Sequence, residues 1–195
     1  MIAKHTLLCL FLSIVGLGLF GCKETKLRIV SVQDFSEFVK ETNYITDAEQ
    51  YGWSIVQKNV FEYEVVSDIN WTNAYDASTV SDDLPVVQVS YNDAKAYADW
   101  NQSEIPDYKK YWELAPKANG LINKNSATIL PISQCQVIGN VWEITAPDLD
   151  GKIRLAGGSF LCNDNSCNGT SSSRMLYIDA ITGNSHIGFA VLESQ

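Results

Sequence analysis

The sequence predicts an α+β domain with few helices, several short strands and long loops. Two segments have the apolar spacing of helices, short apolar runs indicate strands, and turn-forming residues separate them. The chain has 195 residues, of which 46% are hydrophobic and 19% are charged. This length and composition favour one globular domain with a buried core over a disordered chain.

Helical elements are expected at three places along the chain. Apolar residues within 32–39 recur on one helical face. Ser90 and Asp93 form an S-x-x-D capping signal for a helix that runs to about Trp100. A further helix should start near Pro106 and end before Pro116, because proline cannot continue a helix.

Strand-like segments are shorter and less regular than the helical ones. Residues 85–89 are expected to be a strand or an extended segment, residues 152–155 a strand, and residues 187–192 a closing strand. Residues 59–83 contain a strand-like stretch at 61–66, but their many turn formers predict mostly loop.

The first 21 residues are interpreted as a signal peptide. Lys4 supplies a positive charge, and the apolar run over residues 7–20 suits a signal peptide but is shorter than the roughly 20 residues of a membrane span. The run ends at Cys22 in a sequence that resembles a bacterial lipobox. We therefore expect lipidation at Cys22, a tether over residues 22–30 and a domain over residues 31–195. An uncleaved anchor and ordinary secretory cleavage are the alternatives.

Charge and cysteine content follow from this division. Lys and Arg total 14 against 23 Asp and Glu, a net charge of −9, which argues against nucleic-acid binding. A lipid anchor would place the chain in the bacterial cell envelope, outside the cytoplasmic membrane, where disulfides persist. Of the five cysteines, Cys9 would leave with the signal and Cys22 would carry lipid. Cys135, Cys162 and Cys167 remain.

Several blocks, taken in order, resemble the formylglycine-generating enzyme family, also called sulfatase-modifying factors. The blocks are VQDFSEFV at 32–39, YITDAE at 44–49, PVVQVSYNDA at 85–94, YWELA at 111–115, GNVWE at 139–143, GGSFLC at 157–162 and HIGF at 186–189. The resemblance implies that family's irregular fold, which is related to C-type lectins. It also implies a peptide or protein as substrate or partner.

Cys162 and Cys167 carry the main functional question. Two thiolates that converge on one ion suit Cu(I), and a copper–thiolate centre can carry redox chemistry. The resemblance implies that this pair binds copper and oxidises a cysteine in a C-x-P-x-R segment to formylglycine, with Ser159 near the oxygen and substrate site. A disulfide or redox pair, or unligated thiols in an inherited motif, are the alternatives, and Ser159 is otherwise a turn residue.

A calcium site is implied by a second part of the resemblance. Its ligands would be Glu143, the backbone carbonyls of Gly139 and Val141, and Gln136, because Ca²⁺ prefers oxygen ligands. The alternative for Glu143 is a buried carboxylate that accepts hydrogen bonds from loop amides.

Departures from the family pattern leave two functions open. The segment after Cys167 has one arginine, Arg174, where family enzymes have an Arg-rich run that holds the substrate. The chain is therefore either a copper-dependent oxidase of a protein cysteine or an inactive lipoprotein scaffold or binding domain. An iron enzyme would need a His cluster, but His186 is the only histidine after the signal. His186 itself is expected to be structural, and Trp142 to belong to the core.

Overall fold

The structure is a computed structural model of the chain. It describes residues 24–73, 80–115, 123, 126, 128–134, 138–162, 172 and 175–194. The expected signal peptide and Cys22 lie outside them. Among the described residues, no helix is both long enough and apolar enough to cross a membrane.

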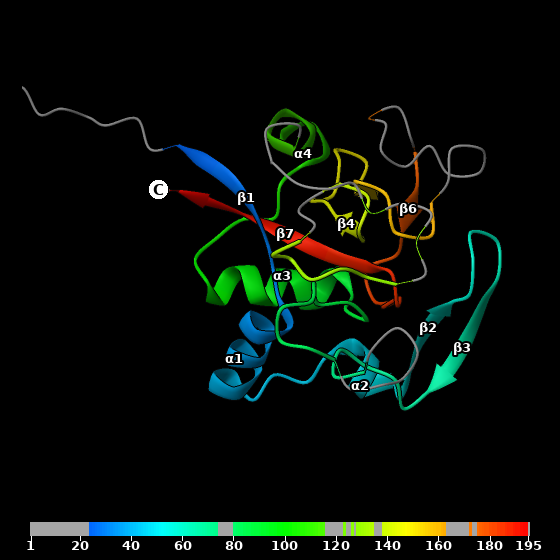
Figure 1. The fold of residues 1–195 in the computed structure, drawn as a ribbon. Coiled ribbons are helices and arrows are strands. Elements are labelled where there is room, and N and C mark those ends of the chain that lie inside the picture. The colour runs from blue at the N-terminus through cyan, green and yellow to red at the C-terminus, as the bar shows by residue number, and fades with distance from the viewer. Residues whose placement is uncertain are drawn as a thin grey trace, which may run out of the picture.

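The main sheet has five strands in the order β1-β7-β4-β5-β6. Its strands are β1 (Thr25–Ile29), β4 (Trp142–Ile144), β5 (Ile153–Ala156), β6 (Tyr177–Ile178) and β7 (Ile187–Ser194). The β4–β7 pair is parallel and the other pairs are antiparallel. A separate hairpin pairs β2 (Trp53–Gln57) with β3 (Tyr63–Ser67), away from the main sheet (Figure 1). The expected α+β class is confirmed.

One expectation about the domain boundary is wrong. The tether expected over residues 22–30 is not separate from the domain, because Thr25–Ile29 form the edge strand β1 against β7. Its alternate residues Leu27 and Ile29 pack in a core cluster with Tyr111. Within residues 59–83, the strand-like stretch forms β3 over Tyr63–Ser67 against β2, and the other described residues lie in turns and loops, as expected.

Four helices are described: α1 (Val32–Thr42), α2 (Asp47–Tyr51), α3 (Tyr91–Trp100) and α4 (Tyr108–Leu114). The capping box at Ser90 and Asp93 is confirmed. The same box begins α1 at Ser31 and the short α2 at Thr46, and α2 was not expected from the sequence. The side chains of these caps satisfy backbone N–H groups that have no partner inside a helix.

The segment 85–89 is extended but does not form a strand of either sheet. Its Val86 N–H donates to the Val30 carbonyl and its Gln88 N–H to the Asn184 carbonyl, at 3.0 Å each. These bonds tie the segment to β1 on one side and to the chain before β7 on the other. The segment therefore links the end of β1 to the chain that precedes β7.

The core has an aromatic centre where α1 and α3 pack on one side of β7, with α4 on the other side (Figure 1). Phe35, Phe38, Tyr97 and Phe189 are at most 2% exposed, and their ring centroids lie 5.3 to 6.3 Å apart in the contacts that join them. Mixed edge-to-face and stacked contacts at these distances stabilise the packing of the two helices against the sheet.

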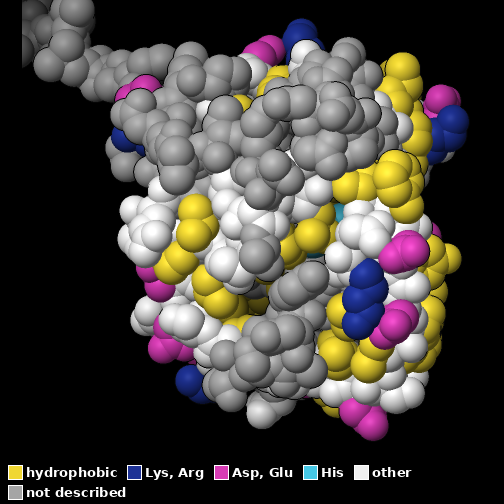
Figure 2. Space-filling view, turned by 45° about the vertical axis from the view of Figure 1, so that its right-hand side comes forward, with side chains coloured by type: hydrophobic (Ala, Val, Ile, Leu, Met, Phe, Trp, Pro, Cys, Tyr) yellow, Lys and Arg dark blue, Asp and Glu magenta, His cyan; other side chains and the backbone are white. Residues whose placement is uncertain are grey.

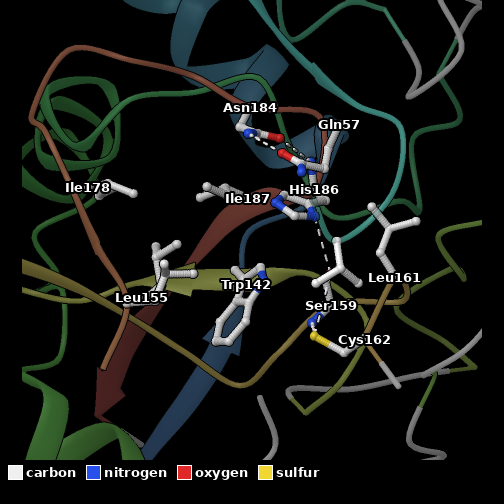
Figure 3. Close-up of a pocket in the computed structure, with 12 residues that line it drawn as sticks. Gln57, Trp142, Leu155, Ser159, Leu161, Cys162, Ile178, Asn184, His186 and Ile187 are labelled. Carbon is white, nitrogen blue, oxygen red and sulfur yellow. Dashed lines mark hydrogen bonds between the residues drawn. The ribbon is translucent and has the colours of Figure 1, made fainter. Parts of the chain in front are cut away.

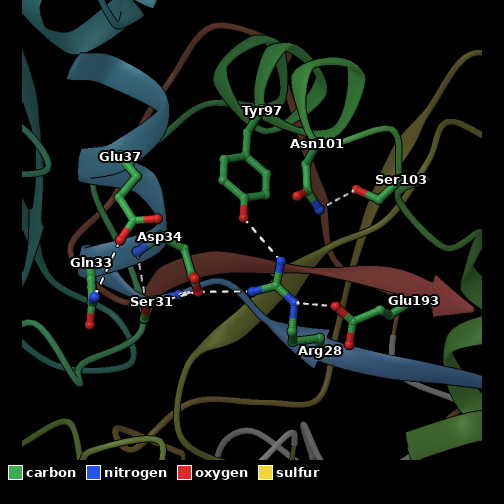
Figure 4. Close-up of polar contacts among 9 residues, drawn as sticks. All are labelled: Arg28, Ser31, Gln33, Asp34, Glu37, Tyr97, Asn101, Ser103 and Glu193. Carbon is green, nitrogen blue, oxygen red and sulfur yellow. Dashed lines mark hydrogen bonds and ion pairs between the residues drawn. The ribbon is translucent and has the colours of Figure 1, made fainter. Parts of the chain in front are cut away.

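A polar cluster closes the edge of this core (Figure 4). The Arg28 guanidinium donates to Asp34 at 2.8 Å and to the Tyr97 hydroxyl at 3.0 Å, and it forms an ion pair with Glu193 at 3.1 Å. One side chain thus links β1, α1, α3 and β7. Charged hydrogen bonds in half-buried positions are stronger than neutral ones, so the cluster fixes the position of β1.

Candidate functional site

A pocket of about 220 Å³ opens between the main sheet and the β2–β3 hairpin (Figure 3). Its walls are mainly apolar and include Trp142, Leu155, Leu161, Leu176, Ile178 and Ile187. Polar side chains from three separate segments meet at one side of it, namely Gln57, Ser159, Asn184 and His186. Figure 2 shows the hollow in this face, with histidine colour visible between hydrophobic side chains.

Ser159 and Cys162 both line this pocket, close to one another. Gly157 and Gly158 have φ values of 86° and 79°, which turn the chain sharply after β5. The Ser159 N–H then donates to the Cys162 sulfur at 3.4 Å, and the Cys162 N–H donates to the Ser159 carbonyl at 2.9 Å. The Ser159 Oγ lies 4.0 Å from the Cys162 sulfur. This short turn presents the sulfur to the pocket.

The Cys162 sulfur is disulfide-bonded in this structure. Cys167, its expected neighbour in the site, lies outside the described residues. A disulfide has no thiolate to offer a metal, so copper binding requires the reduced form. Once reduced, Cys162 is the soft ligand that Cu(I) prefers, and the Ser159 N–H is placed to stabilise its thiolate.

His186 is part of this site, although the sequence indicated only a structural histidine. Its Nδ1 lies 3.2 Å from the Ser159 Oγ, and its side chain lines the pocket. Burial lowers the pKa of His186 to about 3. Its place just before Gly188 and Phe189, within a family block, was the sequence signal that could have placed it at the site.

The loop that carries His186 is held by the β2–β3 hairpin. The His186 N–H and the side chain of Gln57 both contact the Asn184 carboxamide, at 3.3 Å each. The Gln57 N–H also donates to Ser185 Oγ at 2.9 Å. These contacts join β2 to the start of β7 and set the depth at which His186 enters the pocket.

Trp142 has the core position expected of it. It is 2% exposed, belongs to the main core cluster, and also forms part of the pocket wall. Its backbone N–H donates to the His186 carbonyl at 2.9 Å. Trp142 thus connects the core of the sheet to the functional side chains.

Glu143, the expected calcium ligand, is fully buried beside the pocket-forming turn. The Tyr111 hydroxyl donates to its Oε2 at 2.9 Å, and its Oε1 has no hydrogen-bond partner within the described part of the chain. Burial raises the pKa of both groups well above their usual values. The Tyr111 hydroxyl is a partner that the sequence did not indicate.

One oxygen of Glu143 is suited to bind calcium, but its described neighbours supply no second acidic ligand. A buried carboxylate oxygen without a donor is suited to a hard cation. Gly139 and Val141 lie just before β4, and their backbone carbonyls were expected to bind the same ion as Glu143. The Gly139 N–H donates to the Gly157 carbonyl at 3.0 Å. Gln136 lies outside the described residues. The described residues contain no group of three or more His, Cys, Asp and Glu side chains that could hold a metal ion.

The stability of the fold should depend on His186 at acidic pH. Its pKa is about 3 in the folded chain against an ordinary 6.5, so the unfolded chain alone binds a proton between these values. This difference in the pKa of His186 contributes folding stability that is present above pH 6.5 and is lost as the pH falls toward 3. We expect His186→Asn to lose less stability than the wild type between these pH values in urea unfolding. An identical loss in both proteins would contradict this prediction.

Comparison with known proteins identifies the family of the chain. Residues 26–128 match the sulfatase-modifying factor enzyme 1-like domain. The chain is 34% identical over 142 residues to a formylglycine-generating enzyme of Thermomonospora curvata, covering 60% of this chain and 45% of that protein. It is 35% identical over 106 residues to the inactive C-alpha-formylglycine-generating enzyme 2 of Mus musculus, covering 45% and 34%.

A third relative is matched over a longer segment. The chain is 27% identical over 209 residues to a formylglycine-generating enzyme of Streptomyces coelicolor, covering 69% of this chain and 66% of that protein. The chain spans less than half the length of the first two relatives. The domain match begins within β1, in agreement with the corrected domain boundary. The chain belongs to the formylglycine-generating enzyme, or sulfatase-modifying factor, family.

Proposed function

We propose that the reduced chain oxidises a peptidyl cysteine to formylglycine with the help of copper. The observation that carries this proposal is the position of the Cys162 sulfur, which faces a pocket and accepts a hydrogen bond from the Ser159 N–H at 3.4 Å. Cys162 is 3% exposed and belongs to the main core cluster, so its sulfur lies where that core meets the pocket. Relatives named formylglycine-generating enzyme support the same reaction.

Copper would be held by the thiolates of Cys162 and Cys167. Bound there, Cu(I) would supply the redox chemistry with dioxygen that no protein side chain provides. Ser159 would hold the Cys162 thiolate in place through its N–H. The apolar walls around Trp142 would limit the access of water to the reacting thiol.

The reaction balances with an external thiol as the reductant. One substrate cysteine side chain, a methylene group bearing a thiol, reacts with one dioxygen molecule and two reductant thiols. The products are the aldehyde, one hydrogen sulfide, one disulfide and one water. The dioxygen accepts two electrons from the substrate carbon and two from the reductant thiols.

The cellular setting and the second metal belong to the same proposal. We propose that Cys22 carries the lipid and anchors the chain in the bacterial cell envelope, where the peptide or protein substrate lies outside the cytoplasm. We also propose Ca²⁺ at Glu143, where it would occupy the side of the carboxylate that has no donor in the described structure.

The test is conversion of a C-x-P-x-R peptide by the reduced full chain with Cu(I), dioxygen and an excess of thiol, followed by mass spectrometry. We expect the thiol-to-aldehyde mass change with the wild type and with Cys135→Ser, which removes a cysteine not assigned to the site. Cys162→Ser should give no conversion. No conversion by the wild type, or equal conversion by Cys162→Ser, would contradict the proposal.

A non-catalytic binding domain is the second candidate, and the disulfide at Cys162 favours it. The relative named as inactive supports a member of this family without the activity. Counting free thiols on the purified chain tests this candidate. A disulfide that resists mild reduction, together with no copper uptake, would support it over the enzyme.

A further inference from the structure

The pocket beside Cys162 is small and uncharged in its described lining. None of the described lining residues is Asp, Glu, Lys or Arg. Its volume of about 220 Å³ is below the roughly 300–1,000 Å³ typical of sites that enclose a whole small molecule. The pocket therefore suits a neutral part of a larger ligand.

His186 has one ring nitrogen engaged and one directed into this pocket. Nδ1 lies 3.2 Å from the Ser159 Oγ. Within the described chain, Nε2 makes no hydrogen bond, and it points away from Ser159 toward Ile187 (Figure 3). The side chain is polar, its residue is only 8% exposed, and its free nitrogen is aimed at a cavity.

The hydrogen bond to Ser159 determines which nitrogen carries the proton. If Nδ1–H donated to Ser159, the hydroxyl proton would have, among the described residues, only the disulfide-bonded Cys162 sulfur at 4.0 Å, a weak acceptor. If Ser159 donates to Nδ1 at 3.2 Å, the hydroxyl proton has a good acceptor. The second arrangement places the imidazole proton on Nε2, facing the pocket.

We propose that His186 is a hydrogen-bond donor that anchors a neutral peptide segment in the pocket, its Nε2–H bound to a carbonyl oxygen of that segment. The identification of the ligand as a peptide rests on the proposed function. An apolar wall together with one fixed donor is a common basis of specificity in small pockets. The segment would lie beside the substrate thiol, which has to approach Cys162.

The surroundings of His186 keep this donor uncharged. Burial lowers its pKa to about 3, and the only other titratable side chain among the described lining residues is Cys162. The side chains that hydrogen-bond to His186 are the Ser159 hydroxyl and the Asn184 carboxamide, which do not titrate. The donor should therefore be present throughout the range near neutral pH.

The first test reads the proton position directly. The full chain labelled with ¹⁵N-histidine contains His5 and His186, and His186→Asn identifies the second signal. Long-range ¹H–¹⁵N spectra should show His186 protonated at Nε2, with no change between about pH 5 and pH 8. Protonation at Nδ1, or a charged ring appearing in this range, would overturn the proposal.

The second test measures binding without chemistry. The probe is a capped peptide with neutral side chains in which alanine replaces the reactive cysteine, titrated by calorimetry without copper. We expect His186→Leu to weaken binding about tenfold, the effect of losing one hydrogen bond. His186→Asn, which keeps an uncharged donor, should weaken binding less. Absence of binding by the wild type, or equal affinity of His186→Leu, would overturn the proposal.

These binding results are independent of turnover. A chain that binds the alanine peptide through His186 but does not form aldehyde would contradict the proposed oxidation and leave this inference standing. A chain that forms aldehyde equally well with leucine at position 186, and binds the alanine peptide equally well, would contradict this inference and leave the oxidation standing. Thermal unfolding of each variant checks that the fold is retained.

Discussion

Replacement of Gly188 by alanine is expected to lower the free energy of unfolding by about 3 kcal/mol, at the upper end of the usual cost of overpacking. An alanine Cβ at Gly188 would lie 2.3 Å from the carbonyl oxygen of Val86. The obstacle is backbone, and it cannot rotate away as a side-chain end can. Val86 is fully buried, and its N–H is bonded to Val30 at 3.0 Å.

Gly151→Ala is the matched control for this substitution. Gly151 lies in an open turn with φ of 77°, and an added Cβ would meet nothing within 4 Å. Its replacement should cost only the strain of a positive φ, about 1–2 kcal/mol. Urea unfolding of both variants measures the difference. A Gly188→Ala protein as stable as Gly151→Ala would show that β7 and the 85–89 segment are not packed as described.

Phe35→Ala is expected to remove about 3–5 kcal/mol of stability, the usual range for a buried phenylalanine. Phe35 is fully buried at the junction of α1, α3 and β7. Its ring centroid lies 5.3 Å from that of Phe38, 5.4 Å from Trp71, 6.0 Å from Tyr97 and 6.3 Å from Phe189. Truncation leaves a cavity among four rings, and the sheet behind them limits how far they can close it.

Phe61→Ala provides the comparison for a phenylalanine outside the core. Phe61 is 80% exposed at the β2–β3 hairpin. Its truncation should change stability by less than about 0.5 kcal/mol, as for most surface substitutions. Chemical denaturation of the two variants checks this ordering. Equal losses in both would contradict the position of the aromatic core.

The elements with a local signal in the sequence were the ones that could be predicted. The Ser90–Asp93 capping box is self-contained, so it predicted the start of α3 without tertiary information. The closing strand at 187–192 was equally clear, because a continuous apolar run is typical of a buried strand. Ser159 and Cys162 are three residues apart and belong to one short turn, so their proximity depends on local structure.

The features that were missed depend on partners far away in the chain. Thr25–Ile29 become a strand through pairing with β7, at the opposite end of the chain, and a short segment with several polar and charged residues gives little indication of it. His186 joins Ser159 because β7 and the turn after β5 meet beside the parallel β4–β7 pair. A single histidine has no spacing pattern, so its role could only come from the fold.

We propose that Cys162, once reduced, holds copper in the pocket it shares with Ser159 and His186. The most direct test is a competitive Cu(I) titration of the reduced full chain under anaerobic conditions, with Cys135→Ser and Cys162→Ser as paired variants. We expect one high-affinity Cu(I) ion per chain in the wild type and in Cys135→Ser, and its loss in Cys162→Ser. Retention of that ion in Cys162→Ser, or its absence from the reduced wild type, would contradict the claim.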